Sequence, residues 1–276
     1  YEIEQLGEHI EDICYFAAYF DMNEKLFIPE GTKESLKKIK GFSSPARYRN
    51  FLTVVNDLIL EDGTASLKDV RLLYTLFETQ ESMENHIREI LEMATKEGFT
   101  GVEIDYEGIK KDMKLWGFFD EFVKRLYLSA CKKNLPVRIV LEPDTPFDEI
   151  LLPKGPEYVV MCYNLHGYGS VPGPKANIDF IEDIIKKAAN LPGRVGFAFA
   201  TGGYDFQNDG TVAAITEREA VELLKIYNKS ATRDKSSHAL SFNYTDGEGM
   251  YHEVWYGDKN TLESWINIVQ AAGYCN

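Results

Sequence analysis

The chain has 276 residues, of which 44% are hydrophobic and 27% are charged, a composition typical of a globular domain. Its formal net charge of −14 argues against a nucleic-acid ligand, because proteins that bind phosphate backbones usually present basic patches. No run of about 20 apolar residues occurs in the sequence, so we expect no membrane span.

The length suits one large domain, since a barrel of alternating strands and helices takes roughly 250 residues. We therefore predict a single domain over residues 1–276. None of the four cysteines lies in a CxxC pair, so we expect no zinc site. We predict no cofactor. Cys14 and Cys162 fall within apolar runs, which predicts buried thiols. The first residue is Tyr rather than Met, which is typical of a processed or excised chain.

Short apolar runs alternate with amphipathic stretches along the whole chain. Seven runs predict strands: Ile13 to Phe20, Lys25 to Ile28, Arg49 to Asn56, Gly101 to Tyr106, Val137 to Leu141, Tyr158 to Tyr163, and Arg194 to Ala200. Most residues in these runs are β-branched or aromatic and nearly all are apolar, as in strands buried on both faces of a parallel sheet.

Start and stop signals delimit helices between these runs. The predicted helices run from Thr79 to Lys96, with Gly98 as terminator; from the N-cap Asp112 onward; from Glu217 to Tyr227, opened by a Thr216 and Glu219 capping box; and from Asp258 or Asn260 to Ala272. Strand and helix alternation predicts an α/β protein with a parallel sheet, closed into a (β/α)8 TIM barrel.

Two features interrupt the alternation. Ala239 to Trp255 predicts a β-hairpin inserted after the seventh strand, with its turn at Asp246 to Gly249. The eighth strand is missing from the predicted set: either Ala239 to Tyr244 fills its place or it lies beyond Asn276. Because an open barrel would leave bare strand edges, we expect the natural chain to continue past Asn276 with an apolar strand.

The most informative segment places three acids in alternation with apolar residues: Glu103, Asp105 and Glu107. Side chains of a strand alternate between its faces, so the three acids point the same way, which is inward in a closed barrel. Carboxyls packed together in a barrel raise the pKa of at least one of them, as a general acid near neutral pH requires. Glu107 comes last, at the carboxyl end of the strand where barrel active sites lie. The alternative interpretation is an edge strand with a solvated acidic face.

The segment from Thr100 to Glu107 resembles the Asp-Gly-x-Asp-x-Asp-x-Glu signature of glycoside hydrolase family 18, the chitinase-like hydrolases. The last two acids match the signature, whereas Thr100 replaces its first Asp and Glu103 its second. Met161 to Asn164 and Trp255 to Asp258 extend the likeness over nearly the whole chain. The chain looks closest to the bacterial branch of spore-cortex and cell-wall N-acetylglucosaminidases.

The resemblance implies retaining hydrolysis in which the substrate's own N-acetyl group is the nucleophile. Glu107 would protonate the glycosidic oxygen, and Asp105 would orient the acetamido group and stabilise the oxazolinium ion. Tyr163 would donate a hydrogen bond to the acetamido oxygen. Glu103 would hold Asp105 or share a proton with it. Asn164 stands where the family carries Asp in its Met-x-Tyr-Asp pattern.

Further residues are candidates for substrate binding by their place at strand ends or beside the hairpin: Asn164, Met161, Tyr19, Asn56, Glu142, Tyr244 and Trp255. Each could equally be a packing residue.

Three classes of function were weighed on these residues. The first is a glycosidase, cleaving β-1,4 bonds next to N-acetylglucosamine in peptidoglycan, chitin or an N-glycan core. The second is a non-catalytic, chitinase-like carbohydrate-binding protein, which the departures Glu103 and Asn164 would favour. The third, a non-sugar barrel enzyme, has only Gly202-Gly203 as a hint of phosphate binding. The retained Glu107 favours the glycosidase, and we expect an extracellular or cell-surface monomer whose partner is a glycan containing N-acetylglucosamine.

Overall fold

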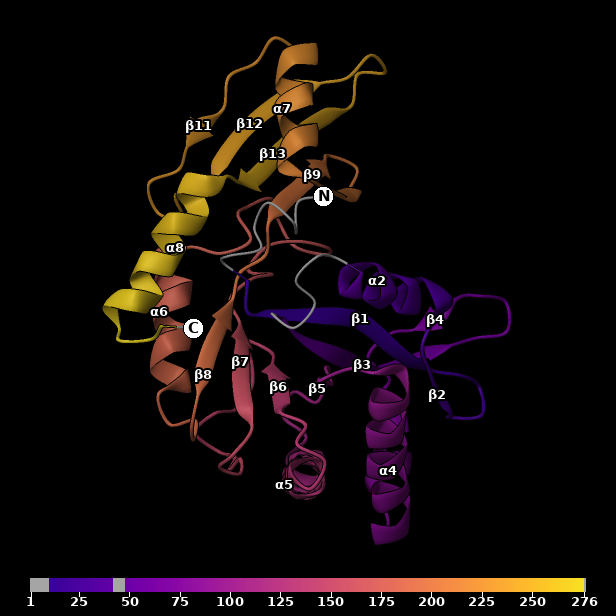
Figure 1. The fold of residues 1–276 in the computed structure, drawn as a ribbon. Helices are drawn as coiled ribbons and strands as arrows, with labels where there is room; N and C mark the ends of the chain where they lie inside the picture. The colour runs from indigo at the N-terminus through magenta and orange to yellow at the C-terminus, as the bar shows by residue number, and fades with distance from the viewer. Residues whose placement is uncertain (1–9, 42–47, 276) are drawn as a thin grey trace. The chain divides into compact units, whose positions relative to one another are not determined.

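The computed structural model describes residues 10–41 and 48–275, which pack into two compact units (Figure 1). The first unit comprises the residues up to 159 together with residues 191–194, and the second comprises residues 160–190 and those from 195 onward. The division falls within one strand, β7 (Glu157–Met161). No helix in the described part of the chain is long and apolar enough to cross a membrane.

The first unit is a parallel sheet with helices. Its strands are β1 (Asp12–Phe20), β3 (Arg49–Ile59), β5 (Gly101–Asp105) and β6 (Val137–Leu141), which lie in that order with the start of β7 beside β6. Neighbouring pairs from β1 to β6 are parallel, and β1 lies alongside β3 in Figure 1. Short antiparallel strands extend it, β2 (Leu26–Phe27) on β1 and β4 (Ala65–Ser66) on β3. Their backbones bring the carboxyl ends of β3, β5 and β6 to one edge.

Four helices belong to the first unit, and two of them begin at the N-caps that the sequence predicts. The four are α2 (Glu30–Lys40), α3 (Val70–Phe77), α4 (Gln80–Glu97) and α5 (Met113–Cys131). Thr79 and Ser82 form a capping box at α4, which ends at Gly98 in the left-handed region, φ 81°. Asp112 accepts a hydrogen bond from the Leu115 N–H at the start of α5. The helices predicted from Thr79 to Lys96 and after Asp112 are therefore confirmed.

A strand with buried residues forms within Lys25 to Ile28, but the prediction that it is a parallel strand of the barrel is wrong. The strand at this place, β2, pairs antiparallel with β1, with Phe27 opposite Tyr19. The connection is a tight turn in which the Asp21 carboxylate accepts hydrogen bonds from the N–H groups of Asn23 and Lys25. A turn of a few residues can only return the chain antiparallel, because a parallel crossover needs a dozen residues or more.

Burial in β1 follows a period of two over Tyr15 to Ala17 rather than the two-sided burial that the sequence predicts. Cys14 and Phe16 are exposed, whereas Tyr15 and Ala17 are buried. Among the described residues this part of β1 is therefore covered on one face. The thiol prediction is confirmed for Cys162, which is buried, and wrong for Cys14.

The second unit begins with the end of β7 and contains β8 (Val195–Ala198), with the Cys162 N–H bonded to the Ala198 carbonyl at 2.7 Å. Two helices, α6 (Ile178–Ala188) and α8 (Lys259–Ala271), pack side by side around the buried Trp265. The part of the chain from β8 to α8 forms an antiparallel sheet, in the strand order β10-β9-β13-β12-β11. Its strands are β9 (Gly202–Gln207), β10 (Val212–Ile215), β11 (Thr232–Arg233), β12 (Leu240–Thr245) and β13 (Tyr251–Gly257).

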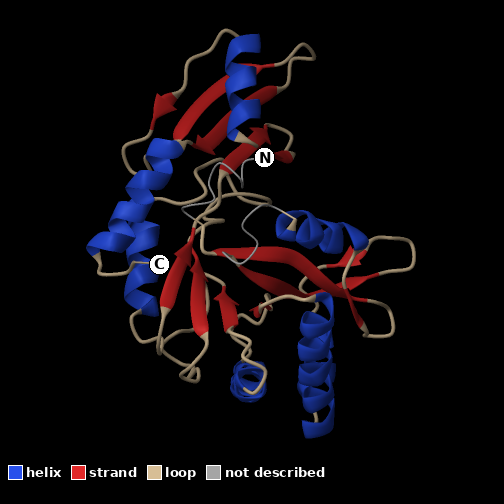
Figure 2. Ribbon diagram, viewed as in Figure 1, coloured by secondary structure: helices blue, strands red, loops and turns tan. Residues whose placement is uncertain are grey.

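This antiparallel sheet is larger than the predicted hairpin. Ala239 to Trp255 contains the antiparallel pair β12 and β13, but three further strands extend it. One face is covered by α7 (Glu217–Ile226), as Figure 2 shows, and the packing is made by residues such as Phe242 and Tyr256. Because Ala239 to Tyr244 belongs to this sheet, the alternative that it supplies the eighth strand of a barrel is wrong. The predicted α/β architecture with a parallel sheet is confirmed, whereas the pairing recorded for residues 10–41 and 48–275 runs from β2 to β8 without a closing pair, so the closed (β/α)8 barrel stays a prediction.

Gly203 is required by strand packing. A Cβ atom there would lie 1.8 Å from the Trp255 carbonyl oxygen, so only glycine lets β9 approach β13 this closely. The pair Gly202-Gly203 thus has a structural explanation, and the hint of phosphate binding loses its basis.

Candidate active site

The three alternating acids share one face of β5 and its extension. Ile104 and Tyr106, on the opposite face, are buried, and the Tyr106 oxygen lies 2.6 Å from His86 Nε2 of α4. The Tyr106 ring also stacks on Phe122 of α5 at 5.9 Å. This packing against the helices fixes the register of the segment, so that Glu103, Asp105 and Glu107 all point away from the helices.

Glu103 lies in the middle of β5 and is held by side chains of neighbouring strands. Its carboxylate accepts a hydrogen bond from Thr53 Oγ1 at 2.7 Å and from Cys14 Sγ at 3.1 Å, and lies 3.5 Å from Arg138 Nη1. We expected Glu103 to hold or share a proton with Asp105. The recorded partners of the Glu103 side chain lie on β1, β3 and β6, so it links these three strands, and the proton shared with Asp105 stays a prediction.

Arg138 extends these links into a network of charges. It pairs with Asp12 and, at 3.1 Å, with Glu157, and Arg49 bridges the same two acids at 2.6 and 2.9 Å. These groups come from β1, β3, β6 and β7 at the start of each strand. The network therefore ties the amino end of the sheet together and leaves its carboxyl end for other chemistry.

Asp105, at the end of β5, is the most perturbed acid of the three. Burial raises its pKa to about 8, and the negative charges of Glu107 and Glu103 add to the shift, while Lys68 opposes it. Its Oδ1 atom is buried and has no hydrogen-bond partner among the described residues. A carboxyl with this pKa is protonated at neutral pH, so it can donate a hydrogen bond as well as accept one.

Glu107 is held by its backbone. Asn56, three residues before the end of β3, is 1% exposed, and its amide group bonds both the N–H and the carbonyl of Glu107. The Glu107 N–H donates to Asn56 Oδ1 at 2.9 Å, and Asn56 Nδ2 donates to the Glu107 carbonyl at 3.0 Å. This pair of bonds fixes the main chain two residues beyond the strand, where the side chain can still be reached from solvent.

Two charged side chains, Lys68 and Glu142, lie beside the side chain of Glu107. Its carboxylate pairs with the Lys68 ammonium, which also lies 3.5 Å from Glu142 Oε1. Burial raises the pKa of Glu107, and the negative charge of Glu142 adds to this, whereas Lys68 acts in the opposite direction. The other oxygen of Glu142 accepts the Gly108 N–H at 2.6 Å. Asn56 and Glu142, both predicted at strand ends, therefore contact the Glu107 segment.

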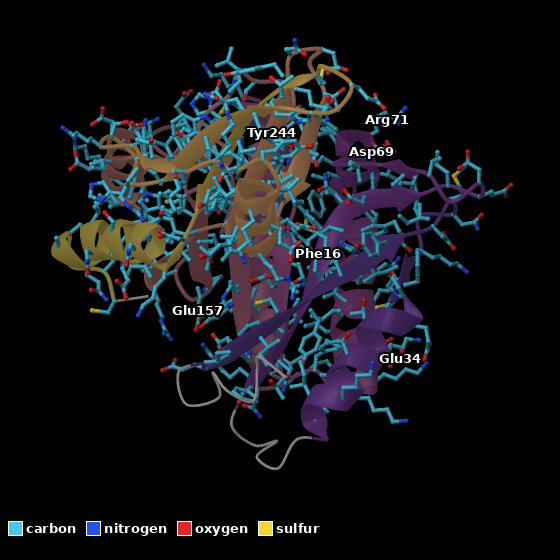
Figure 3. The ribbon with its side chains drawn as sticks, turned by 90° about the horizontal axis from the view of Figure 1, so that it is seen from above. Phe16, Glu34, Asp69, Arg71, Glu157 and Tyr244 are labelled. Atoms are coloured by element: carbon cyan, nitrogen blue, oxygen red, sulfur yellow. The ribbon has the colours of Figure 1, made fainter. Side chains whose placement is uncertain are left out.

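Lys68 is the residue that sequence reasoning missed. It lies 39 positions before Glu107 and follows β4, which folds back along the end of β3. The next residue, Asp69, caps α3 and binds Arg71 at 2.8 Å, and Figure 3 shows these two side chains next to one another. A lysine before a helix cap carries no catalytic signal in a sequence, since its partner is chosen by the pairing of β4 with β3.

Tyr19, a predicted binding residue on β1, is partly buried at the same edge. Burial and the charge of Asp57 raise the pKa of the Tyr19 hydroxyl. Asp57 follows Asn56 on β3 and accepts the Lys68 N–H at 2.8 Å. Tyr19 is thus linked to the segment that positions Lys68.

The remaining predicted residues belong to the second unit. Met161 is buried at the end of β7, Tyr163 is partly buried, and Asn164 is exposed with φ 66°. Trp255 on β13 donates its ring N–H to Glu253 at 2.7 Å. Both faces of the Tyr244 ring are covered, by Tyr227 at 4.2 Å and by His252 at 4.3 Å, so we leave Tyr244 out of the proposed site.

Within the described ranges, no group of three or more His, Cys, Asp or Glu side chains is arranged to hold a metal ion. The groups that meet around Glu107 are carboxyls, an amide and an ammonium at the carboxyl edge of a parallel sheet. Carboxyl groups gathered at this edge of a sheet can serve as the general acid of a hydrolase.

The comparisons with known proteins agree with that class. No family model matches the chain. Curated relatives that are named glycosylases or cortical fragment-lytic enzymes are 22% to 28% identical to it. The cortical fragment-lytic enzyme of Bacillus subtilis is 24% identical over 206 residues, which cover 67% of this chain and 46% of that protein. The chain spans about half the length of the first three of these relatives.

Solved structures show the same fold. The spore cortex-lytic enzyme SleL of Bacillus cereus superimposes with a TM-score of 0.81 at 18% identity, covering 99% of this chain and 64% of that one. A chitinase from Chromobacterium violaceum gives a TM-score of 0.82 at 15% identity, covering 99% and 86%. The resemblance to the chitinase-like hydrolases near the spore-cortex enzymes is therefore confirmed.

Proposed function

We propose that this protein is a glycoside hydrolase that cleaves β-1,4 linkages in glycans containing N-acetylglucosamine. The observation that carries the proposal is the pair formed by Asp105 and Glu107. Glu107 is fixed through its backbone at the end of β5 with a carboxyl whose pKa is raised by burial, and Asp105 beside it has a pKa of about 8. Relatives named glycosylase, cortex-lytic enzyme and chitinase support the same activity.

In the proposed reaction Glu107 gives its proton to the glycosidic oxygen as the bond to the anomeric carbon breaks. The carbonyl oxygen of the substrate's N-acetyl group attacks that carbon and forms an oxazolinium ion. Water then opens this ion and returns a proton to Glu107, so the enzyme ends as it began. A general acid of this kind contributes about 100- to 10,000-fold to the rate.

Asp105 would act on the acetamido group. Its carboxyl lies on the same face as Glu107, and Oδ1 has no partner among the described residues, which leaves it available to the substrate N–H. We assign to Tyr163 the hydrogen bond to the acetamido oxygen, on the strength of its Met-x-Tyr motif. The polymer is peptidoglycan, chitin or an N-glycan core, and the cortex-lytic relatives favour a cell-wall substrate met outside the cell or in the spore.

The test is incubation of the protein with peptidoglycan, chitin oligosaccharides and a high-mannose N-glycan, followed by mass spectrometry of the products. Release of a reducing-end N-acetylglucosamine from at least one of them is expected. The matched control is the de-N-acetylated chitin oligosaccharide, which should remain intact because it has no carbonyl to attack the anomeric carbon. Hydrolysis of both would exclude substrate assistance, and binding without hydrolysis of any would favour a carbohydrate-binding protein.

A further inference from the structure

Contacts with the last part of β3 place the Lys68 ammonium beside Glu107. Lys68 adopts a left-handed backbone conformation, φ 53°, which is uncommon for a residue other than glycine, asparagine or aspartate. Its N–H donates to the Asp57 carboxylate at 2.8 Å, and the Asp69 N–H donates to the Asn56 carbonyl at 2.8 Å. The end of β3 thus positions Lys68 and, through Asn56, Glu107 as well.

Gly108 shows how closely the two loops approach. A Cβ atom at Gly108 would lie 3.3 Å from the Lys68 carbonyl oxygen and 3.4 Å from the Lys68 Cβ, and the φ of Gly108 is 81°. The Gly108 N–H is bound by Glu142. Side-chain to main-chain hydrogen bonds from Asn56, Asp57 and Glu142 therefore hold the loops that carry Lys68 and Glu107.

We propose that Lys68 and Glu142 form an ion pair that controls the protonation of the general acid Glu107 in both halves of the catalytic cycle. The inference rests on the proposed function. When Glu107 has given up its proton, the ammonium stabilises its carboxylate. When Glu107 is protonated, Glu142 retains the ammonium close by, so that the cation stays in place between the two steps.

The signs of the two effects are opposite. The described charged groups that face Glu107 are Lys68, Glu142 and, on its own segment, Asp105; Asp57 faces the main chain of Lys68. Removal of the ammonium would leave three carboxyls without a cation and would make Glu107 hold its proton to higher pH. Removal of the Glu142 charge would leave Lys68 to Glu107 alone and would make Glu107 lose its proton at lower pH.

The direct test is a titration of the Glu107 side-chain carboxyl by ¹³C NMR in the protein without substrate. The signal is assigned by its loss in Glu107→Gln. Lys68→Met should move the midpoint up by about one pH unit, an allowance for the partial exposure of the pair, and Glu142→Gln should move it down. Lys68→Arg, which keeps the charge, should restore the parent midpoint. Lys111→Met removes an exposed positive charge from the loop that follows Glu107 and is the matched control.

Unchanged midpoints in both variants, or shifts in the same direction, would overturn the proposal. If Lys68→Met does not fold, the Glu142→Gln titration alone still decides the sign. The alkaline limb of kcat/KM on a chitin oligosaccharide should follow the same shifts, because a general acid is active only while protonated. A parent protein without hydrolytic activity would refute the proposed function and leave the titration informative, whereas an active parent with unmoved midpoints would refute only the role of Lys68.

Discussion

Asp105→Asn should make the protein more stable, and increasingly so as the pH rises. The carboxyl of Asp105 has a pKa of about 8 in the folded protein and about 3.9 in an unfolded chain. Between these values the folded state binds a proton that the unfolded state does not. The stability that this proton contributes is complete below about pH 4 and is lost as the pH rises towards 8. Asparagine keeps the size of the side chain and cannot ionise, so the variant escapes this loss.

The magnitude follows from the linkage relation. A group in this window changes the free energy of unfolding by about 1.4 kcal/mol per pH unit, so the upper bound between pH 5 and pH 7 is about 3 kcal/mol. The charges of Glu103 and Glu107 and local relaxation share the effect, and we expect about 1 to 2 kcal/mol. For a chain of this length that corresponds to a change of about 2 to 6 °C in Tm.

The assay is a series of thermal melts of parent and variant from pH 5 to pH 8. The quantity of interest is the difference in Tm between the two proteins, because a change of shape or hydrogen bonding contributes equally at every pH. The difference should grow with pH. If it stayed constant, Asp105 would be ionised throughout, and its assignment as a neutral carboxyl beside Glu107 would be refuted.

Three further substitutions have expected outcomes. Asn56→Ala removes both hydrogen bonds to the Glu107 backbone and should lower the free energy of unfolding in urea by about 2 to 4 kcal/mol. The folded fraction should have a lower kcat, and a kcat equal to that of the parent would show that Asn56 does not position the acid. Arg138→Met leaves the buried Glu103 carboxylate without its ion-pair partner, while Asp12 and Glu157 keep Arg49, and should cost about 3 to 5 kcal/mol at pH 7, less at low pH where carboxyls protonate; a pH-independent loss would point to packing instead. Tyr163→Phe should lower kcat far more than it raises KM, since its hydrogen bond strengthens as the acetamido oxygen attacks; a change in KM alone would contradict that role.

Local patterns predicted the parts of the fold that depend on neighbouring residues. Alternation placed Glu103, Asp105 and Glu107 on one face because Ile104 and Tyr106 need the helices on the other. The capping box at Thr216 and Glu219 likewise marks the start of a helix, and α7 begins at Glu217. In each case the physical cause lies within a few residues of the structure that it produces, so the local sequence is enough to predict that structure.

Features set by distant pairing were not predictable in this way. The hydrogen bonds between Asn56 and the Glu107 backbone join residues 51 positions apart, and an asparagine near the end of a strand can equally stabilise a turn or bind a ligand. Lys68 reaches Glu107 only because β4 folds back on β3. The extent of the antiparallel sheet in the second unit was not predicted for a similar reason. β9 and β10 are short, and a glycine such as Gly203 is typical of loops; its place in a strand is explained only by its packing against Trp255.

The central claim is that Glu107 is the proton donor of a glycosidase, and Glu107→Gln tests it most directly. Glutamine keeps the size of the side chain but cannot protonate a leaving oxygen. The rate on an unactivated N-acetylglucosamine oligosaccharide should fall about 100- to 10,000-fold, a substrate with a good leaving group should be affected less, and sugar binding should survive. Full activity of Glu107→Gln, or a parent protein that binds the oligosaccharide and never cleaves it, would contradict the claim.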